Sequence, residues 1–150
     1  MLRRDPAAKP RSLAQRRHGR LLVVDGDEGR RLALADALKG DGHDVEEASN
    51  ALSAARLAIR SPPDLVIADV ALEDVSGITL CTALRRDPET IRVLVLVLSS
   101  VGSEAERVEA FEAGADDYMT RPFSTRELLL RARALLRRVP SPKKRGADRR

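Results

Sequence analysis

Five short apolar runs alternate with five amphipathic segments along this chain, and no other feature constrains the fold as strongly. Each run is only five to seven residues long. The first, third and fourth are apolar except at their ends, which is typical of strands buried on both faces, whereas the second and fifth are mixed. We expect strands at residues 20–25, 43–48, 64–69, 92–98 and 115–119. We expect helices at residues 27–39, 51–59, 77–86, 104–113 and 125–138. A strict alternation of this kind predicts an α/β fold, with a parallel sheet that has helices on both faces.

The expected helices carry apolar residues three or four positions apart, as a helix packed on a sheet requires. In the first two helices these faces contain Leu32, Ala35 and Leu38, then Leu52, Ala55 and Ile59. In the later helices we expect inward side chains at Ile78, Cys81 and Leu84, at Val108 and Phe111, and at Leu128, Leu129, Ala132, Leu135 and Leu136. Hydrophobic residues make up 43% of the chain but aromatic residues only 2%, so the predicted core is aliphatic.

The net charge of +4 is unevenly distributed along the chain. Residues 1–20 carry seven Lys/Arg and one acid, residues 139–150 carry five and one, and the segment between carries 15 and 21. The middle is therefore acidic, at −6, between ends of +6 and +4. We expect one domain at residues 20–138 between disordered basic tails at 1–19 and 139–150.

No apolar run approaches the roughly 20 residues of a membrane-spanning helix, and the N-terminus does not resemble a secretory signal. Cys81 is the single cysteine, which excludes an internal disulfide framework and fits a reducing compartment. These observations predict a cytoplasmic domain with no contact with a membrane.

Polar residues follow the expected strands at the points where they end. Asp25, Asp69 and Ser99 end the first, third and fourth strands, and Tyr118 and Arg121 lie at and just after the fifth. Carboxyl ends of parallel strands meet at one edge of the sheet, so we expect these residues to converge. Two neighbouring carboxylates repel each other and need a cation, for which Mg²⁺ with oxygen ligands is suited. A hydroxyl and a guanidinium beside them would suit a phosphoryl group, which a carboxylate can itself accept.

Four segments resemble the response regulator receiver domain family: LLVVDGDE, PDLVIADVALEDVSG, VLVLSS and EAGADDYMTRPFSTREL. The resemblance covers about residues 20–138. It implies a flavodoxin-like (βα)5 fold, a doubly wound parallel sheet with strand order 2-1-3-4-5. It also implies a signalling domain rather than an enzyme, which takes a phosphoryl group from a histidine kinase or phosphotransfer protein in a two-component phosphorelay, using Mg²⁺.

The resemblance assigns roles to the residues of the acidic site. Asp69 matches the phosphoacceptor, and Asp25 matches the first of two paired acids after the first strand. Ala71 matches the residue whose backbone carbonyl binds the metal. The implied metal ligands are therefore Asp25, Asp69 and the carbonyl of Ala71.

Further roles follow on the fourth and fifth strands. Ser99 matches the hydroxyl residue that contacts the phosphoryl group, and Tyr118 matches an aromatic that turns inward on activation. Arg121 takes the place of the family's lysine, and Pro122 matches a proline that often follows a cis peptide bond. The resemblance predicts that Ser99 and Tyr118 form a switch, and that the last two helices with the fifth strand bind a downstream protein or a second copy in a weak dimer.

Three positions depart from the family pattern. Gly26 stands where the second paired acid is usual, and that acid is the usual direct metal ligand. Asp27 is one residue further on, so its side chain should point elsewhere. Arg121 keeps the positive charge of the lysine but is longer and planar. Glu73 stands where a proline is common. Mg²⁺ is therefore expected to bind weakly.

Three alternative functions stay open. A pseudo-receiver would bind partners without phosphorylation, which Gly26 and Arg121 favour. A flavin- or nucleotide-binding domain would need a phosphate-cradling loop after the first strand, whereas the acidic loop at residues 25–28 would repel phosphate. The basic tails could bind nucleic acid, but they have no interleaved aromatic residues, and direct DNA binding is not expected.

Overall fold

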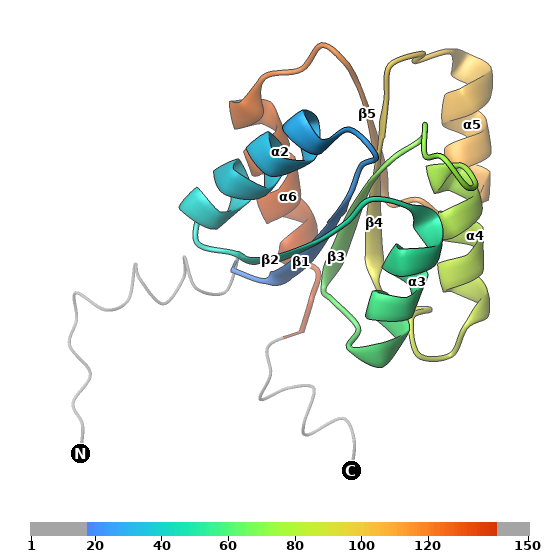
Figure 1. Cartoon of the computed structure of the whole chain (residues 1–150), viewed down its shortest axis with the longest axis horizontal. Helices are drawn as coiled ribbons and strands as arrows, with labels where there is room; N and C mark the ends of the chain where they lie inside the picture. Colours follow the sequence, from blue (N-terminus) through green and yellow to red (C-terminus); the bar gives the residue numbers. More distant parts are fainter. Residues whose placement is uncertain (1–17, 141–150) are drawn as a thin grey trace.

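The described part of the chain forms a five-stranded parallel sheet covered by helices on both faces (Figure 1). The computed structural model describes residues 18–140. The strand order is β2-β1-β3-β4-β5, as the family resemblance implied. The elements, in chain order, are β1 (Arg20–Val24), α2 (Glu28–Gly40), β2 (Asp44–Ala48), α3 (Ala51–Arg60), β3 (Leu65–Asp69), α4 (Gly77–Arg86), β4 (Leu94–Ser99), α5 (Glu104–Glu112), β5 (Asp117–Thr120) and α6 (Thr125–Leu136).

The three central strands are almost wholly buried, which explains their continuous apolar sequences. Every residue of β3 is buried, and β1 and β4 are exposed only at their first residues. The register pairs Val24 with both Ala48 and Ala68, and it pairs Asp69 with Leu98. Because all strands run in one direction, their last residues lie along one edge of the sheet, which is called here the carboxyl edge.

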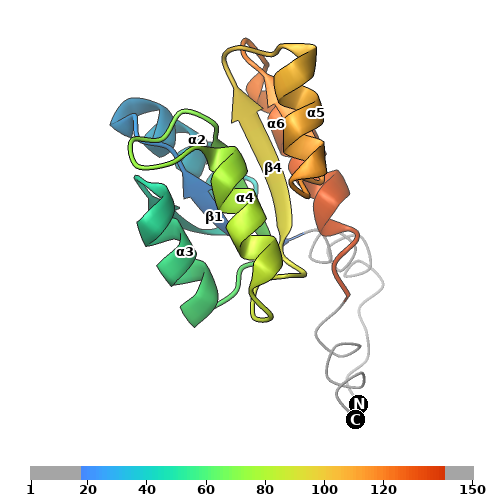
Figure 2. The same cartoon turned by 90° about the vertical axis from the view of Figure 1, so that its right-hand side faces the viewer.

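Two helices cover one face of the sheet and three cover the other (Figures 1 and 2). Helices α2 and α6 pack over one apolar cluster that includes Leu38, Leu128 and Leu136. Helices α3, α4 and α5 pack over a second cluster that includes Leu80 and Leu84. The sheet therefore contributes to two aliphatic cores, one on each face.

A polar side chain starts each helix by accepting a hydrogen bond from a backbone N–H in its first turn, which defines the helix boundaries. The N-cap residues are Asp27, Asn50, Ser76, Ser103 and Ser124. Ser124 caps α6, which has Glu127 in its first turn.

Helix α3 faces the sheet with alanines rather than with its larger apolar residues. Ala54 and Ala58 are each 1% exposed, whereas Leu52 is 56% and Ile59 is 42% exposed. A face built from alanines lets the helix backbone approach the sheet closely. The expected apolar face through Leu52 and Ile59 is therefore wrong as a core face.

Helix α5 likewise buries an alanine and exposes its larger apolar residues. Ala110 is fully buried, whereas Val108 and Phe111, which we expected to point inward, are 45% and 46% exposed. Leu32 on α2 is also exposed, at 44%. The inward positions on α4 and α6 are confirmed, since Cys81, Leu84, Leu128 and their expected neighbours are buried, with Leu129 only half-buried.

The loop between β3 and α4, residues 70–76, is fastened at its base and at its tip. Gly77 N–H donates to the Val70 carbonyl at 3.0 Å, and a Cβ at Gly77 would lie 2.2 Å from the Asp69 carbonyl oxygen. The Asp74 carboxylate accepts from the backbone N–H groups of Ala51 and Leu52 at the start of α3, which lowers the Asp74 pKa. The loop thereby leads the chain back over the end of β3.

Most of the two expected tails lies outside the described residues. Of the ranges 1–19 and 139–150, the structure describes only residues 18, 19, 139 and 140. Within the described part of the chain, every helix is too short or too polar to cross a bilayer.

Candidate functional site at the carboxyl edge of the sheet

Four of the residues expected to converge do lie at the carboxyl edge. Asp69 and Ser99 are the last residues of β3 and β4, and Asp25 follows β1 directly. Arg121 follows β5, and its backbone N–H donates to the Ser99 carbonyl at 2.8 Å. The parallel topology thus gathers residues that are far apart in the sequence.

The Asp69 side chain is only 4% exposed, and its carboxylate is held from two sides. Its Oδ1 accepts from Nη1 of Arg121 at 2.6 Å, and its Oδ2 accepts from the backbone N–H of Ala71 at 2.9 Å. A second guanidinium, that of Arg30, approaches Oδ2 to 3.8 Å. The acceptor candidate therefore lies between two positive charges.

The Asp25 carboxylate is 2% exposed and forms a two-pronged pair with Arg30. Nε of Arg30 donates to Oδ2 at 3.0 Å, and Nη2 donates to Oδ1 at 2.9 Å. This geometry matches the planar fork of a guanidinium to a carboxylate. The hydrogen bond to Asp25 is the main reason that the pKa of Arg30 is raised, with burial opposing it. Arg121 adds a contact to Asp25 at 3.5 Å.

These four residues, Asp25, Arg30, Asp69 and Arg121, are called the acceptor cluster. The sequence pattern identified three of them and missed Arg30. The available signal was an arginine in the first turn of the helix that follows a buried, strand-terminal aspartate.

The acceptor cluster does not fit a divalent cation in this arrangement. Both Asp25 oxygens are bound to Arg30, and both Asp69 oxygens already accept hydrogen bonds. Within residues 18–140, no group of three or more His, Cys, Asp or Glu side chains is placed to hold a metal ion. Two guanidinium groups provide the positive charge that a metal would supply.

Asp27 does not replace the acid missing at Gly26. Its carboxylate caps α2 by accepting from the Arg30 backbone N–H at 2.9 Å. Its side chain is 51% exposed, and the cap interaction is the largest cause of its lowered pKa. The expectation that this residue points elsewhere agrees with its role as the helix cap.

Ser99 and Tyr118 are linked through Glu106 on α5, and these three residues are called the switch cluster. The Ser99 hydroxyl and the Tyr118 hydroxyl both donate to Oε1 of Glu106, the latter at 2.6 Å. The Tyr118 side chain is already inside, at 7% exposure. Burial, followed by the hydrogen bond to Glu106, raises the Tyr118 pKa.

Sequence reasoning did not identify Glu106. It is one of two acids in the first turn of α5, and only the fold places its carboxylate between Ser99 of β4 and Tyr118 of β5. The structure shows one ring position for Tyr118, the inward one, so the expected two-position switch stays a prediction.

Arg121 precedes Pro122 through a cis peptide bond, as the resemblance implied. Its guanidinium carbon lies 5.9 Å from the centre of the Phe123 ring, within the range of a cation–π contact. The side chain is 20% exposed, so it bridges the acceptor cluster and solvent.

The acids near β5 pair with arginines of the same chain. Arg131 donates to both oxygens of Asp117, at 3.1 and 3.0 Å. Arg138 donates to Asp116 at 3.1 Å, and Arg85 on α4 donates to its other oxygen at 2.9 Å. On the face formed by α5, β5 and α6, both acids are therefore already paired with arginines of the same chain.

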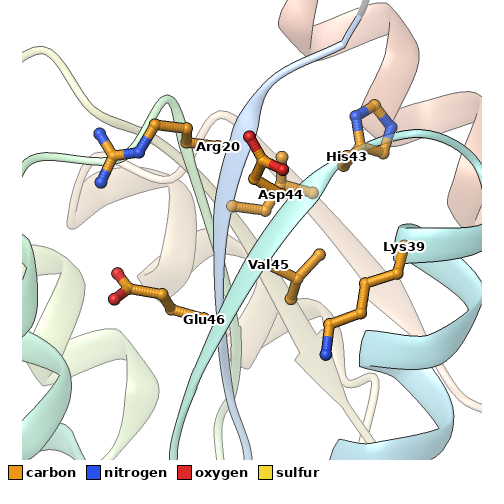
Figure 3. Close-up of a pocket in the computed structure, with 7 residues that line it drawn as sticks. Arg20, Lys39, His43, Asp44, Val45 and Glu46 are labelled. Atoms are coloured by element: carbon orange, nitrogen blue, oxygen red, sulfur yellow. The ribbon is translucent and has the colours of Figure 1, made fainter.

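A separate cavity of about 300 Å³ lies along edge strand β2 (Figure 3). Its lining includes Arg20, Lys39, Asp44 and Glu46, and the figure shows acidic and basic side chains interspersed around it. No sequence-predicted site residue lines it. This mixture of charges does not favour one class of ligand.

Comparisons with known proteins agree with this architecture. A family model described as the response regulator receiver domain matches residues 21–133. The chain is 40% identical over 120 residues to the DNA-binding dual master transcriptional regulator RpaA of Synechocystis, a match that covers 80% of this chain and 50% of that protein. It is 39% identical over 119 residues to the phosphate regulon transcriptional regulatory protein PhoB of Pseudomonas aeruginosa, covering 79% and 52%.

Solved structures show the same fold. A putative response regulator from Chloroflexus aurantiacus superposes with a TM-score of 0.76 at 35% identity, covering 80% of this chain and 98% of that one. The receiver domain of the Francisella response regulator 1452 gives a TM-score of 0.75 at 29% identity, with the same coverage. The chain spans about half the length of the curated relatives it matches. Fold, strand order and matched sequence together show that the chain belongs to the response regulator receiver domain family of two-component signalling.

Proposed function

We propose that this receiver accepts a phosphoryl group on Asp69. The observation that supports this proposal is the position of the Asp69 carboxylate, which ends the central strand with a guanidinium bonded to one oxygen and a backbone N–H to the other. Both hydrogen-bond donors are preorganised for negative charge at this point. The phosphoryl group comes from a histidine kinase or phosphotransfer protein, as for receivers generally.

In the proposed step, one Asp69 oxygen forms a bond to phosphorus while the bond between phosphorus and the donor nitrogen breaks. The donor nitrogen keeps the electron pair of the broken bond, and an aspartyl phosphate results. Arg121 stabilises the negative charge that develops during the transfer, because it already contacts Asp69. Ser99 provides a hydroxyl at the end of the neighbouring strand, if it exchanges its bond to Glu106 for one to the phosphoryl group.

Receiver domains generally bind Mg²⁺ at the acidic site. For this chain we propose weak binding only, with Asp25, Asp69 and the Ala71 carbonyl as ligands. Support comes from Gly26, which supplies no carboxylate, and from Arg30, which must leave Asp25 before a metal ion can approach.

The test is labelling by a small-molecule donor. The wild-type chain is incubated with acetyl phosphate and Mg²⁺, and its intact mass is measured for a gain of about 80 Da, the mass of one phosphoryl group. We expect the gain in wild type and its loss in Asp69→Asn. Asp116→Asn, a carboxylate removed away from the site, is the matched control and should label like wild type. Labelling that persists in Asp69→Asn, or its absence in wild type, contradicts the proposal.

A second candidate function is a pseudo-receiver, a module that binds partners without being phosphorylated. The specific observation in its favour is the acceptor cluster itself, whose two carboxylates are already balanced by two guanidiniums. Absence of labelling, together with wild-type partner binding by Asp69→Asn, would support this function over the first.

For output, we propose the face formed by α5, β5 and α6. Val108, Phe111 and Leu130 are partly exposed there, beside the arginine–aspartate pairs at Asp116 and Asp117. A second copy on this face would be held weakly, since exposed ion pairs contribute only about 0–1 kcal/mol each. Light scattering across a concentration series at low salt measures such a dimer, and a strictly monomeric chain would contradict it.

The location and the range of partners rest on this proposal. A cytoplasmic location, where a kinase would meet the receiver, agrees with Cys81 being the single cysteine, and it stays a prediction. We also keep the prediction that the receiver itself does not bind DNA, because the DNA-binding activity of RpaA belongs to a whole protein of which this chain covers half.

A further inference from the structure

Arg30 is held at the acceptor cluster by the fold of its own helix. It is the third residue of α2, and its backbone N–H is bonded to the cap residue Asp27 at 2.9 Å. The cap sets the direction of the first turn, and from there the guanidinium reaches back to Asp25. The Arg30 side chain is 44% exposed, although the Asp25 carboxylate it binds is 2% exposed. The arginine therefore covers a buried acid from the solvent side.

The charges of the cluster balance without any added ion. Asp25 and Asp69 provide two negative charges, and Arg30 and Arg121 provide two positive ones. The Arg30 guanidinium contacts both carboxylates, at 2.9 Å to Asp25 and 3.8 Å to Asp69, and Arg121 does so at 3.5 and 2.6 Å. Arg30 alone binds both oxygens of Asp25, so a divalent ion approaching that carboxylate would meet repulsion and occupied ligand atoms.

We propose that Arg30 is an internal counter-ion that takes the position of the divalent metal between Asp25 and Asp69, and that it determines whether the site binds metal. Metal enters only when the Arg30 side chain swings out toward solvent, on which it already borders. Arg30 thus suppresses metal binding at Asp25, and Gly26 adds to this effect by lacking a carboxylate.

The backbone around Gly26 leaves room for an added carboxylate, which would favour metal binding. A Cβ on Gly26 would meet nothing closer than the Ser49 carbonyl oxygen, at 3.5 Å, an ordinary contact distance. A carboxylate can therefore be added at Gly26 without rebuilding the loop. Removing the guanidinium and adding the acid should convert the neutral cluster into one with three acids and one arginine.

The test measures metal binding, with no need for phosphorylation. Mg²⁺ is titrated by calorimetry into wild type, Arg30→Ala, and the double variant Gly26→Asp with Arg30→Ala. Thermal unfolding is followed in MgCl₂ and in NaCl of equal ionic strength. Removing the positive charge that competes with the metal for Asp25 should tighten binding at least about tenfold in Arg30→Ala, and more in the double variant.

Arg31→Ala is the matched control, because it removes the same charge from the next position of the same helix. Arg31 pairs with Glu47 and with the Asp25 backbone carbonyl, not with the Asp25 carboxylate. It should bind Mg²⁺ as wild type does. Equal tightening in Arg31→Ala would mean that only net charge matters, and it would overturn the proposal.

Arg30→Ala leaves a buried carboxylate with one fewer partner, so Arg30→Gln serves as a second variant that retains hydrogen-bond donors. Stabilisation by Mg²⁺ that is larger in either variant than in wild type supports the counter-ion role. Wild-type Mg²⁺ affinity in both folded variants overturns it. Phosphoryl labelling is read separately by mass, so the proposed acceptor role of Asp69 can fail while this inference stands, and the reverse.

Discussion

At the ends of β1 and β3, two buried aspartates face two arginines, whereas the Glu106 carboxylate faces two hydroxyl groups, those of Ser99 on β4 and Tyr118 on β5. The acceptor cluster is balanced by full charges, which act over several ångströms and tolerate an exchange of one cation for another. The switch cluster relies on directional hydrogen bonds from neutral donors, which are lost within a small displacement. The two clusters therefore differ in the interaction that holds them together. One is suited to exchanging charged groups, and the other to sensing small movements.

The largest effect expected from this contrast is in Arg121→Ala. The variant leaves Asp69, with a side chain 4% exposed, without its closest cation, and stranding one partner of a buried pair costs about 3 kcal/mol. Arg121→Lys, which restores the family's residue and keeps the charge, should lose less than half of that. Urea unfolding followed by circular dichroism measures both. A loss below about 1 kcal/mol in Arg121→Ala would show that the aspartates do not depend on paired charges.

A smaller effect is expected when the switch cluster loses its carboxylate. Glu106→Ala leaves the Ser99 and Tyr118 hydroxyls without their common acceptor and should cost about 1–3 kcal/mol. Glu106→Gln keeps an acceptor oxygen in the same place and should cost less. Glu109→Ala, on the exposed side of the same helix, controls for helix propensity. If Glu106→Ala unfolds at the same urea concentration as Glu109→Ala, the hydrogen bonds of the switch cluster do not stabilise the fold.

The smallest effect is a shift in titration at Tyr118, the chain's only tyrosine, in a chain without tryptophan. Its folded pKa is raised above the ordinary value of about 10 by burial and by Glu106. Because the folded pKa lies above the unfolded one, this group's contribution to stability is complete below the unfolded pKa. That contribution is lost as pH rises through the folded pKa.

Ultraviolet absorbance reports tyrosinate formation at this single site. Glu106→Gln should move the titration to lower pH by removing the negative charge beside the hydroxyl. Arg121→Lys, a change in the other cluster, should leave the midpoint where it is in wild type. A midpoint that moves in Arg121→Lys but not in Glu106→Gln would mean that the acceptor cluster, not the switch cluster, sets the Tyr118 titration.

The parallel sheet was predictable because the central strands are short apolar runs that alternate with amphipathic segments. Its strand order followed only from the resemblance to the receiver family. Asp25, Asp69, Ser99 and Arg121 were also predictable, since strand-terminal positions converge in any parallel sheet. The inward faces of α3 and α5 were not, because Ala54, Ala58 and Ala110 allow close packing that a preference for large apolar residues does not anticipate.

The partners of the site were the least predictable part. Arg30 and Glu106 are ordinary charged residues in first helical turns, positions where charges are common on solvated surfaces. Their roles depend on the rotation of each helix about its axis and on side-chain reach, neither of which is encoded in residue spacing alone. Gly26 signalled that a ligand was missing, but it did not indicate which group had replaced it.

The fastening of the loop at residues 70–76 has a mechanical consequence. Its base is clamped where the backbone of Gly77 lies against the Asp69 carbonyl, and its tip is tied through Asp74 to the first amides of α3. A segment held at both places connects the backbone beside Asp69 directly to the start of α3, on the face of the sheet opposite to α6. A shift of that backbone would therefore pull on the first amides of α3 as well as on the contacts of Asp69.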